Sequence, residues 1–496
     1  MTDHLSRVSQ CQLSDLIEQL SEEWAALPIS GVQLDSRQVL PGDLFIALQG
    51  SDLDGNRFID DAVDRGAVAV LSDREEDSDR WHLPVIFRPQ LRAEVGSIAA
   101  KFYNTPSQDL PVIGVTGTNG KSSITLLIAQ WLEALDKPCP VMGTLGNGRP
   151  DNLQPSPNTT PDAVTVQRLL AEWRDGGAAA VAMEVSSHAL VQERVSGVQF
   201  TAAVFSNLSH DHLDYHGSWE AYRQAKRRLF ENDSLQFAVI NADDDSAAEM
   251  RSALRDECRC ISLSVEGGDA DVVLLESELS LQGMRLRWRS PWGEFECQSA
   301  LLGDFNRFNL LAAWTTLVAL DHDPQALIDV ADQLRPVPGR LQLVREYGWQ
   351  GAQVVVDYAH TPDALDQALA SLSHLCDGQL WCVIGCGGDR DRAKRAEMAA
   401  IARRRADQIV FTSDNPRSED PQSIIDEMCA GIEDPADRVE VDRRSAIEWA
   451  LQGAGPEDCV LIAGKGHERY QEIGGRRLPF DDVAVARAMM RRRAGS

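Results

Sequence analysis

A glycine-rich sequence, Gly114-Val-Thr-Gly117-Thr118-Asn119-Gly120-Lys121-Ser122-Ser123, lies between an apolar run and the helix-like stretch Ile124–Leu135. Three glycines let the backbone turn so that consecutive N–H groups point inward, the helix N-terminus adds a positive dipole, and Lys121 adds a mobile cation. Ser122 stands where a P-loop places its magnesium-binding hydroxyl, although the interval from Gly114 to Gly120 is one residue longer than in the standard pattern. A glycine turn capped by serine is the alternative, but this motif between a strand and a helix favours a nucleotide-phosphate site.

Short β-branched apolar runs alternate with amphipathic stretches of helix length beyond residue 108. The runs are Val112–Val115, Ala179–Met183, Ala202–Phe205, Ala238–Ile240, Val354–Val356, Leu380–Ile384, Ile409–Phe411 and Val460–Ala463. This alternation predicts βαβ units and parallel sheets. Polar clusters such as EVSSH, DYAHTPD and GKGHE follow nearly every run, and open α/β sheets bind ligands beyond the carboxyl ends of their strands. The pattern therefore predicts an α/β enzyme.

Length and composition indicate a globular protein of several domains. The chain has 496 residues, of which 43% are hydrophobic and 25% charged, enough for about three domains. Polar, proline-containing segments at 104–111 and 335–340 mark candidate boundaries. The predicted domains are therefore 1–108, 109–336 and 337–496.

Charge and cysteine usage narrow the partners and the compartment. A formal net charge of −28 makes the chain a poor candidate for binding nucleic acid or an anionic membrane. The first ten residues lack the apolar core of a signal peptide, and the apolar run at 310–320 is too short to span a bilayer. Ten scattered cysteines without a CxxC pair indicate reduced thiols. These features predict a cytoplasmic protein with no membrane span and no nucleic-acid partner.

Three of the ten histidines fall within residues 210–216, which read HDHLDYH. A transition-metal site is one interpretation, but the phosphate loop already implies Mg²⁺, which prefers oxygen ligands, and favours a histidine that contacts magnesium or phosphate. Glu184, at the end of an apolar run, is the natural carboxylate ligand, with a capping or surface role as the alternative. Lys226 lies in the amphipathic stretch Glu220–Phe230, where a solvated lysine is the simpler interpretation.

Two clusters in the last third of the chain suit an amino acid as ligand. Asp414-Asn-Pro-Arg417 follows an apolar run, and an arginine on a proline-stiffened turn suits bidentate capture of a carboxylate. Gly464-Lys-Gly-His-Glu468 offers close backbone approach and a carboxylate for an ammonium group. Surface arginines paired with neighbouring aspartates are the alternative, and GCGG at 385–388 is a weak dinucleotide signal.

These motifs occur together in a known family. TGTNGKSS, EVSSHAL, NLSHDHLDYHG, GDFNRFNLLAA, DYAHTPDAL, GCGGDRDR, DNPR and AGKGHE, in this order, with LDSR at 34–37 and DGNRFI at 54–59, closely resemble the Mur ligases of peptidoglycan synthesis over nearly the whole chain. The resemblance implies an α/β fold of three domains. The central one would be a P-loop-type ATPase domain with a parallel or mixed sheet, and the C-terminal one would be Rossmann-like.

The resemblance also implies an ATP-driven amide ligation. ATP would phosphorylate the γ-carboxylate of the D-glutamyl residue of UDP-N-acetylmuramoyl-L-alanyl-D-glutamate. The amine of meso-diaminopimelate would then attack the acyl phosphate and expel phosphate. Mg²⁺ is the implied cofactor, and we expect a monomer.

The same resemblance assigns residues to each ligand. Catalysis would use Lys121, Glu184, His212 and a carbamylated Lys226, and Mg²⁺ would contact Ser122, Glu184, His212 and Lys226. ATP would contact Gly117, Thr118, Asn119, Gly120, Lys121, Ser122, Ser123, Asn306, Asn309, Arg340 and Asp357. The UDP-muramoyl-dipeptide would contact Leu34, Ser36, Ser51, Asp52, Leu53, Asn158, Thr159, Thr160, Ser186, Gln192 and Arg194. Diaminopimelate would contact Arg390, Asp414, Asn415, Pro416, Arg417, Gly464 and Glu468.

Arg417 would select diaminopimelate over L-lysine, because lysine lacks the far carboxylate that pairs with the guanidinium group.

Other functions stay open at this point. A lysine-adding ligase and a folylpolyglutamate synthetase are alternatives within the superfamily, although LDSR disfavours the folate enzyme. A nucleotide-dependent switch without ligase chemistry is the alternative from another class.

Overall fold

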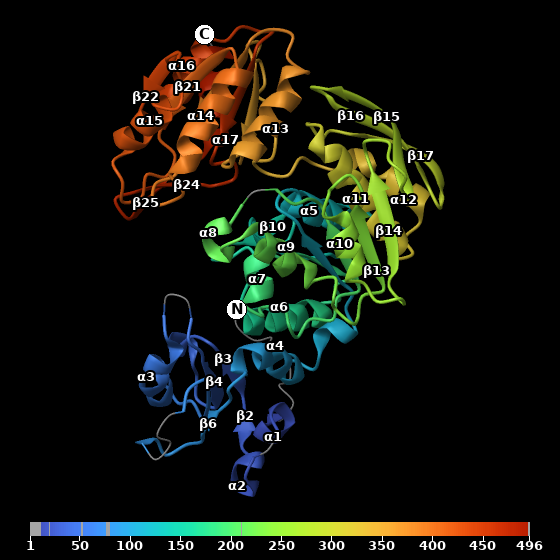
Figure 1. Ribbon diagram of the computed structural model, residues 1–496, viewed down its shortest axis with the longest axis vertical. Coiled ribbons are helices and arrows are strands. Elements are labelled where there is room, and N and C mark those ends of the chain that lie inside the picture. The colour runs from blue at the N-terminus through green and yellow to red at the C-terminus, as the bar shows by residue number, and fades with distance from the viewer. Residues whose placement is uncertain (1–10, 19, 51–52, 76–79, 210, 495–496) are drawn as a thin grey trace.

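The computed structural model describes residues 11–18, 20–50, 53–75, 80–209 and 211–494. N-terminal elements lie at one end of the long axis, the central elements follow, and the C-terminal elements lie at the other end (Figure 1). Within these ranges, no helix combines the length and the apolar character that a membrane crossing requires.

A small parallel sheet forms the N-terminal part. Its strands, in spatial order, are β3 (Gly31–Gln33), β4 (Asp43–Ala47), β5 (Ala69–Ser72) and β6 (Val85–Phe87). The flanking elements are β1 (Cys11–Gln12), α1 (Leu13–Leu16), α2 (Glu22–Ala25), β2 (Pro28–Ile29), α3 (Ile59–Asp64) and α4 (Leu91–Phe102). Leu44 and Ile46 pack in the cluster that contains α4, whereas Phe45 packs in the cluster that contains α3, because side chains alternate along a strand. Helices therefore cover both faces of this sheet.

The central part is built on a mixed sheet, eleven strands wide among the described residues. Its spatial order is β10 (Asn152–Gln154), β9 (Gly146–Arg149), β8 (Val141–Gly143), β11 (Val181–Glu184), β7 (Val112–Thr116), β12 (Ala202–Phe205), β13 (Phe237–Asn241), β14 (Arg259–Ser264), β15 (Val272–Ser280), β16 (Gly283–Ser290) and β17 (Gly293–Ser299). Strands β8 to β15 in this order are parallel, and β9, β10, β16 and β17 pair antiparallel. The predicted runs that become β7, β11, β12 and β13 are thus confirmed as parallel strands.

Helices pack on both faces of the central sheet. They are α5 (Lys121–Ala134), α6 (Ala163–Asp175), α7 (Ser187–Val191), α8 (Leu213–His216), α9 (Trp219–Arg227), α10 (Ala247–Ser252), α11 (Phe305–Ala319) and α12 (Pro324–Asp329). Helices α5 and α11 share one apolar core with β7 and β12, and α6 and α7 share another. The apolar run at 310–320 is therefore a buried core helix. Trp314 and its neighbours on this helix are buried against other parts of the protein.

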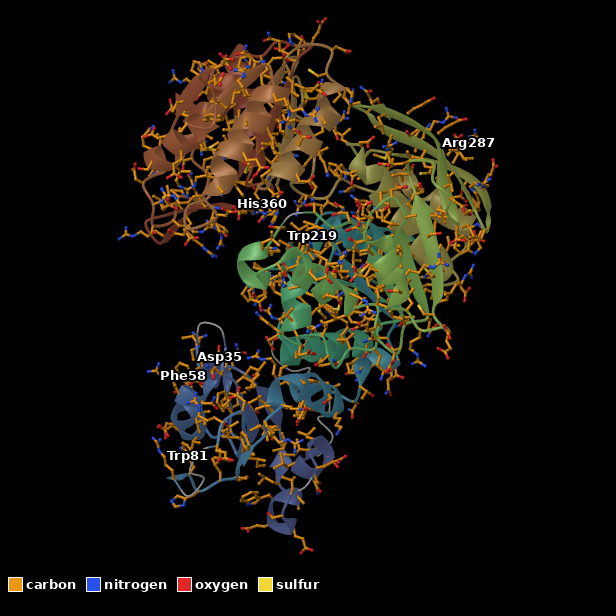
Figure 2. The ribbon with its side chains drawn as sticks, in the orientation of Figure 1. Asp35, Phe58, Trp81, Trp219, Arg287 and His360 are labelled. Atoms are coloured by element: carbon orange, nitrogen blue, oxygen red, sulfur yellow. The ribbon has the colours of Figure 1, made fainter. Side chains whose placement is uncertain are left out.

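Strands β15, β16 and β17 extend the central sheet as antiparallel ribbons. Their outward residues alternate in charge, so that Arg285 pairs with Glu296 and Arg287 with Glu276. Figure 2 places Arg287 on the outer side of this extension. Trp288 instead faces inward and packs against Trp314, with ring centroids 5.0 Å apart.

The C-terminal part is a second doubly wound sheet. Its strands, in spatial order, are β18 (Gln342–Val344), β19 (Gln353–Asp357), β23 (Cys459–Ala463), β20 (Leu380–Ile384), β21 (Gln408–Thr412) and β22 (Arg438–Glu440), all parallel except β18. Its helices are α13 (Pro362–Ser373), α14 (Ala393–Arg405), α15 (Pro421–Cys429), α16 (Arg443–Gly453) and α17 (Asp482–Ala494), and a hairpin joins β24 (Tyr470–Ile473) to β25 (Arg476–Pro479). The α/β class and the Rossmann-like C-terminal sheet are confirmed.

Candidate functional site

The phosphate loop turns sharply between β7 and α5. Gly117 and Gly120 have φ angles of +148° and +89°, which side-chain-bearing residues rarely adopt, and a Cβ on Gly120 would lie 2.6 Å from Asn309 Oδ1. Lys121 Nζ donates to the carbonyl oxygens of Gly117 and Thr118, both at 2.8 Å. Burial lowers the pKa of Lys121, against the opposing charges of Glu184 and Asp211. The lysine side chain therefore folds back onto the backbone of the loop.

Gly114 lies in the predicted strand run Val112–Val115, and its expected part in turning the loop is wrong. Gly114 lies inside β7, where a Cβ would sit 2.9 Å from the ring of Phe200. This glycine provides close packing between the strand and the neighbouring core, and does not turn the backbone. The turn therefore contains only two of the three glycines, Gly117 and Gly120.

The prediction of a solvated Lys226 is also wrong. Its side chain is 1% exposed, and Nζ donates to Gly117 O at 2.7 Å and lies 4.6 Å from the centre of the Tyr222 ring. Burial and the charge of Lys121 hold the pKa of Lys226 well below its usual range. The opposing charge of Asp211 is the smaller effect. Lys226 is therefore a buried amine at the phosphate loop, beside Lys121.

Glu184 ends β11 beside the same loop and is 2% exposed. Thr144 donates to both of its carboxylate oxygens, from N to Oε1 at 2.8 Å and from Oγ1 to Oε2 at 3.2 Å. Its backbone carbonyl accepts a bond from Thr160 Oγ1 at 2.7 Å. Glu184 is thus a buried carboxylate held in one orientation, which excludes the surface and capping alternatives.

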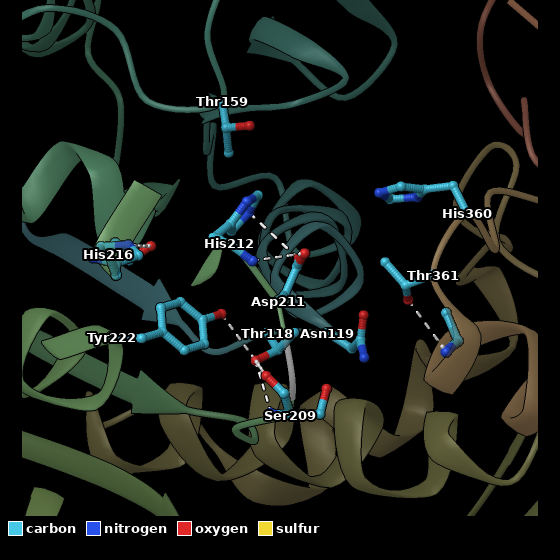
Figure 3. A network of polar contacts seen from close by, with 12 residues as sticks. Thr118, Asn119, Thr159, Ser209, Asp211, His212, His216, Tyr222, His360 and Thr361 are labelled. Carbon is cyan, nitrogen blue, oxygen red and sulfur yellow. Dashed lines mark hydrogen bonds and ion pairs between the residues drawn. The ribbon is translucent and has the colours of Figure 1, made fainter. Parts of the chain in front are cut away.

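The histidine cluster lies at the mouth of the loop. Figure 3 shows Asp211 beside His212, and Tyr222 bonded to Thr118 of the phosphate loop. His212 Nε2 lies 3.4 Å from Asp211 Oδ2, and its ring meets the ring of His188 edge-on at 4.8 Å. Partial burial lowers the pKa of His212 to about 4, against the opposing effect of Asp211. The ring is therefore neutral near pH 7. His210 lies outside the described residues.

The groups around the loop suit Mg²⁺. Ser122 supplies a hydroxyl and Glu184 a carboxylate, both largely buried, and Mg²⁺ is commonly held by one or two carboxylates together with substrate phosphates. The part of the chain that the structure describes has no cluster of three His, Cys, Asp or Glu side chains that would hold a metal alone. Lys226 as an amine does not fit a metal, whereas a carbamate on its Nζ would add an oxygen ligand.

The remaining residues assigned to ATP include two asparagines on α11, beside the loop, and Asp357 at the end of β19 in the C-terminal sheet. Asn306 and Asn309 lie on α11, where Asn309 Nδ2 donates to Asn306 Oδ1 at 2.8 Å and Asn306 Nδ2 donates to Leu302 O at 2.6 Å. Asp357 ends β19, and its carboxylate accepts the N–H groups of Leu341 and Ala359 at 2.6 and 2.7 Å. Burial raises the pKa of Asp357.

Arg340 lies in the segment that joins the central and C-terminal sheets. Its guanidinium group stacks on the Tyr358 ring at 4.6 Å. The structure thus brings both asparagines to the phosphate loop, and places Arg340 with Asp357 at the start of the C-terminal sheet.

The residues assigned to the UDP-linked substrate separate into two groups. Thr159, Thr160, Ser186, Gln192 and Arg194 surround Glu184, where Arg194 donates to Gln192 Oε1 and to Thr160 O. Asn158 is exposed at the edge of this group. Leu34, Ser36 and Leu53 lie in the N-terminal part, and Leu53 is 70% exposed. Ser51 and Asp52 lie outside the described residues.

The residues assigned to diaminopimelate meet at the carboxyl ends of β21 and β23. Asn415 Nδ2 donates to Glu468 Oε2 at 2.7 Å, and a Cβ on Gly464 would overlap Asp414. Lys465, which sequence reasoning missed, donates to Asn415 Oδ1 and Glu468 Oε2, both at 2.9 Å. The two loops therefore form one polar cluster.

Arg417 and Arg390 both lie close to Gly387. A Cβ on Gly387 would lie 3.0 Å from Arg417 Nη1 and 3.8 Å from Arg390 Cγ. Arg417 adopts φ +52°, and its Nη1 donates to Gly388 O at 2.7 Å. Pro416, next to it, packs so closely on Gly388 that no side chain fits there. The GCGG glycines thus serve close loop packing, which accounts for them without a dinucleotide.

Two polar contacts join the phosphate loop region to the C-terminal sheet. Lys394 Nζ lies 3.3 Å from Asp211 Oδ1, and Asn119 Nδ2 donates to Asp363 Oδ2 at 3.0 Å. His360 lies on the edge of the C-terminal part that faces the central part (Figure 2). Sequence reasoning missed Asp211, Lys394 and Asp363, although each lies inside or beside a quoted motif. The sequence of a motif does not show which other motif it contacts in the folded protein.

Comparisons with known proteins agree with this geometry. The chain matches the family models described as "Mur ligase family, catalytic domain" over residues 28–103, "Mur ligase middle domain" over 115–317 and "Mur ligase, glutamate ligase domain" over 339–466. It is 47% identical over 466 residues to the UDP-N-acetylmuramoyl-L-alanyl-D-glutamate–2,6-diaminopimelate ligase of Chromobacterium violaceum, covering 93% of this chain and 94% of that one.

Two solved structures are similar to the chain over nearly its whole length. A structure titled UDP-N-acetylmuramoyl-L-alanyl-D-glutamate–2,6-diaminopimelate ligase matches with a TM-score of 0.73 and 39% identity over 98% of this chain and 99% of that one. The MurF ligase of Thermotoga maritima in complex with ADP matches with a TM-score of 0.63 and 16% identity over 94% of this chain and 97% of that one, which supports the fold alone. From the three matching models and the near full-length relatives, the chain belongs to the Mur ligase family.

Proposed function

We propose that this chain is an ATP-dependent amide-forming ligase that adds meso-diaminopimelate to UDP-N-acetylmuramoyl-L-alanyl-D-glutamate in peptidoglycan precursor synthesis. The observation that carries the proposal is the junction of two sites. A phosphate loop with Lys121, Lys226 and Glu184 faces a C-terminal sheet whose loops carry a polar amino-acid cluster, and Lys394 joins the two sides through Asp211. A relative that covers nearly the same length carries this name.

The proposed reaction has two steps. A γ-carboxylate oxygen of the D-glutamyl residue attacks the γ-phosphorus of ATP, so that an acyl phosphate forms and ADP leaves. The amine of diaminopimelate then attacks the acyl carbon, loses a proton and expels phosphate. Both steps bring anions together, and the loop N–H groups with Lys121 would stabilise the charge that develops on the phosphoryl oxygens.

Lys226 suits carbamylation because a buried amine with a lowered pKa is a nucleophile. The ammonium group would first lose a proton. The neutral nitrogen would then attack CO₂ and lose a second proton, so that a repelling cation becomes a carboxylate-like carbamate. Ser122, Glu184, His212 and this carbamate would then hold Mg²⁺. When bound, Mg²⁺ would offset the repulsion between phosphate and carboxylate oxygens.

The ligand assignments are those that the family resemblance implies. ATP would lie on the loop 117–123, with Asn306, Asn309, Arg340 and Asp357 around it, and the dipeptide would lie beside Glu184 on Thr159, Thr160, Ser186, Gln192 and Arg194. Leu34, Ser36 and the 51–53 segment would hold the uridine end. Arg390, Asp414 to Arg417, Gly464 and Glu468 would hold diaminopimelate, with Arg417 on its far carboxylate. We further propose domains at 1–108, 109–336 and 337–496, a monomer, and a cytoplasmic location.

The test is phosphate release from ATP, measured with the UDP-muramoyl-dipeptide and a panel of amino acids. We expect release with meso-diaminopimelate and at least about 10⁴-fold less with L-lysine, since lysine leaves the arginine unpaired. Comparable rates with the two amino acids would refute the specificity. ATP hydrolysis that needs neither dipeptide nor amino acid would favour a nucleotide switch and refute the ligase.

A further inference from the structure

Lys465 is a fully buried cation in the amino-acid cluster. Its side chain is 0% exposed, and Nζ lies 2.9 Å from Asn415 Oδ1, 2.9 Å from Glu468 Oε2 and 3.8 Å from Asp414 Oδ1. Gly464 and Gly466 flank it with φ angles of +110° and +53°, so the chain can turn and bring the lysine inward. Because no part of this side chain reaches solvent, a ligand in the cluster cannot contact it directly.

The contacts of Lys465 fix the orientation of two neighbours. Asn415 Oδ1 accepts bonds from Lys465 Nζ and from Glu472 N, both at 2.9 Å, so its amide group cannot flip without losing both. Its Nδ2 donates to Glu468 Oε2, the same oxygen that accepts from Lys465. Among the described residues, no hydrogen-bond donor reaches Glu468 Oε1. This oxygen is therefore held in place and available to an ammonium group.

Charge gives Lys465 a second effect. Asp414 and Glu468 are two carboxylates in one buried cluster, and burial raises the pKa of Asp414 while Lys465 lowers it. Without a cation between them, the two carboxylates would repel each other. Lys465 Nζ lies within 4 Å of a carboxylate oxygen of each and offsets this repulsion, so that Glu468 can present a carboxylate oxygen to an ammonium group.

We propose that Lys465 is a positioning residue that sets the geometry and charge of the site for the ammonium group of the incoming amino acid. It acts through Asn415 and Glu468 and does not touch the substrate. This inference rests on the proposed function, because it requires that the cluster binds the amino-acid substrate.

The test is steady-state kinetics of Lys465→Met, which keeps an unbranched side chain one atom shorter and removes the charged amine. We expect the KM for meso-diaminopimelate to rise about tenfold or more, as expected when a charge-assisted hydrogen bond to a buried carboxylate is lost. The KM values for ATP and for the UDP-muramoyl-dipeptide should stay within about twofold. Lys137→Met, at an exposed lysine of the central part, is the matched control and should change none of the three.

A double-mutant cycle separates positioning from a general structural role. If Lys465 acts through Glu468, the variant with both Lys465→Met and Glu468→Gln should bind diaminopimelate about as weakly as the weaker single variant. Additive losses, an unchanged KM for diaminopimelate, or equal increases for all three substrates would each overturn the inference. If Lys465→Met gives no cooperative thermal transition, Lys465→Gln replaces it, with the same expected direction.

Failure of the proposed function gives a different result. If the wild-type protein uses another amino acid, the diaminopimelate assignment fails, and the same variants are measured with that amino acid. If calorimetry detects no binding of any amino acid to the wild-type protein with nucleotide and dipeptide present, both proposals fail.

Discussion

Replacing Asp482 with asparagine should destabilise the C-terminal part more than any surface substitution. Asp482 and Arg443 form an ion pair in which both side chains are 0% exposed, with two hydrogen bonds of 2.8 Å. Arg443 Nη2 also donates to Ala463 O at 2.9 Å, immediately before the cluster that contains Lys465. Removing one partner of a buried pair costs about 3–5 kcal/mol, because the other charge stays buried without compensation.

This cost translates into a measurable change in melting temperature. For a domain of this size, 1 kcal/mol lowers Tm by roughly 2–4 °C, so Asp482→Asn should lower the Tm of the C-terminal transition by roughly 6–20 °C. Differential scanning calorimetry of the full chain measures it. The exposed neighbour Arg444→Met is the control, and its Tm should change by no more than about 2 °C.

A double variant tests whether the unpaired buried charge causes the loss of stability. Arg443→Met together with Asp482→Leu removes both charges and should be less destabilised than Asp482→Asn alone, because no buried charge is left unpaired. A wild-type Tm for Asp482→Asn would refute the argument. So would a double variant that melts below the single one.

The other predictions concern catalysis, specificity and pH. Lys226→Ala should lose most ligase activity and regain part of it in high acetate, if its carbamate serves as a metal ligand; full activity without acetate would exclude that role. Arg417→Ala should raise the KM for diaminopimelate about tenfold or more and leave ATP affinity, measured by calorimetry, within about twofold; equal losses would contradict the assignment. Bonds from Arg395 and from the Asp389 N–H lower the pKa of Glu419 from 4.5 to about 2, so its stabilising effect should be complete above about pH 4.5 and lost as pH falls toward 2. Tm measured against pH for Glu419→Gln should accordingly show a flatter acid limb than for the wild type, and identical limbs would refute this.

Continuous apolar runs made the parallel strands predictable. A strand buried on both faces, such as Leu380–Ile384, consists almost entirely of apolar residues and is conspicuous in a sequence. Strands β16 and β17 alternate polar and apolar residues, as at Arg287 and Trp288, and contain no continuous apolar run. The N-terminal sheet is only partly conspicuous, since β3 and β6 have three residues each whereas β4 is a buried strand of five.

Side-chain environments were harder to predict than elements. The periodicity around Lys226 correctly indicates a helix. The burial of the Lys226 side chain, however, depends on Gly117, which is distant in the sequence, and on Tyr222, which no motif singles out. Lys465 stands inside a quoted motif, yet its partner Asn415 lies fifty residues away in the chain. The family resemblance, and not the local sequence pattern, indicated that Lys226 belongs to the site.

The bond between Asn119 and Asp363 has a thermodynamic consequence. It connects the loop that would receive the nucleotide to the first turn of α13, and Asp211 with Lys394 adds a second connection nearby. A ligand that displaces Asn119 from Asp363 changes the free energy of the docked arrangement, and therefore the affinity of the opposite side for its own ligand. Linkage is reciprocal, so occupancy by the amino acid must alter nucleotide affinity by the same factor.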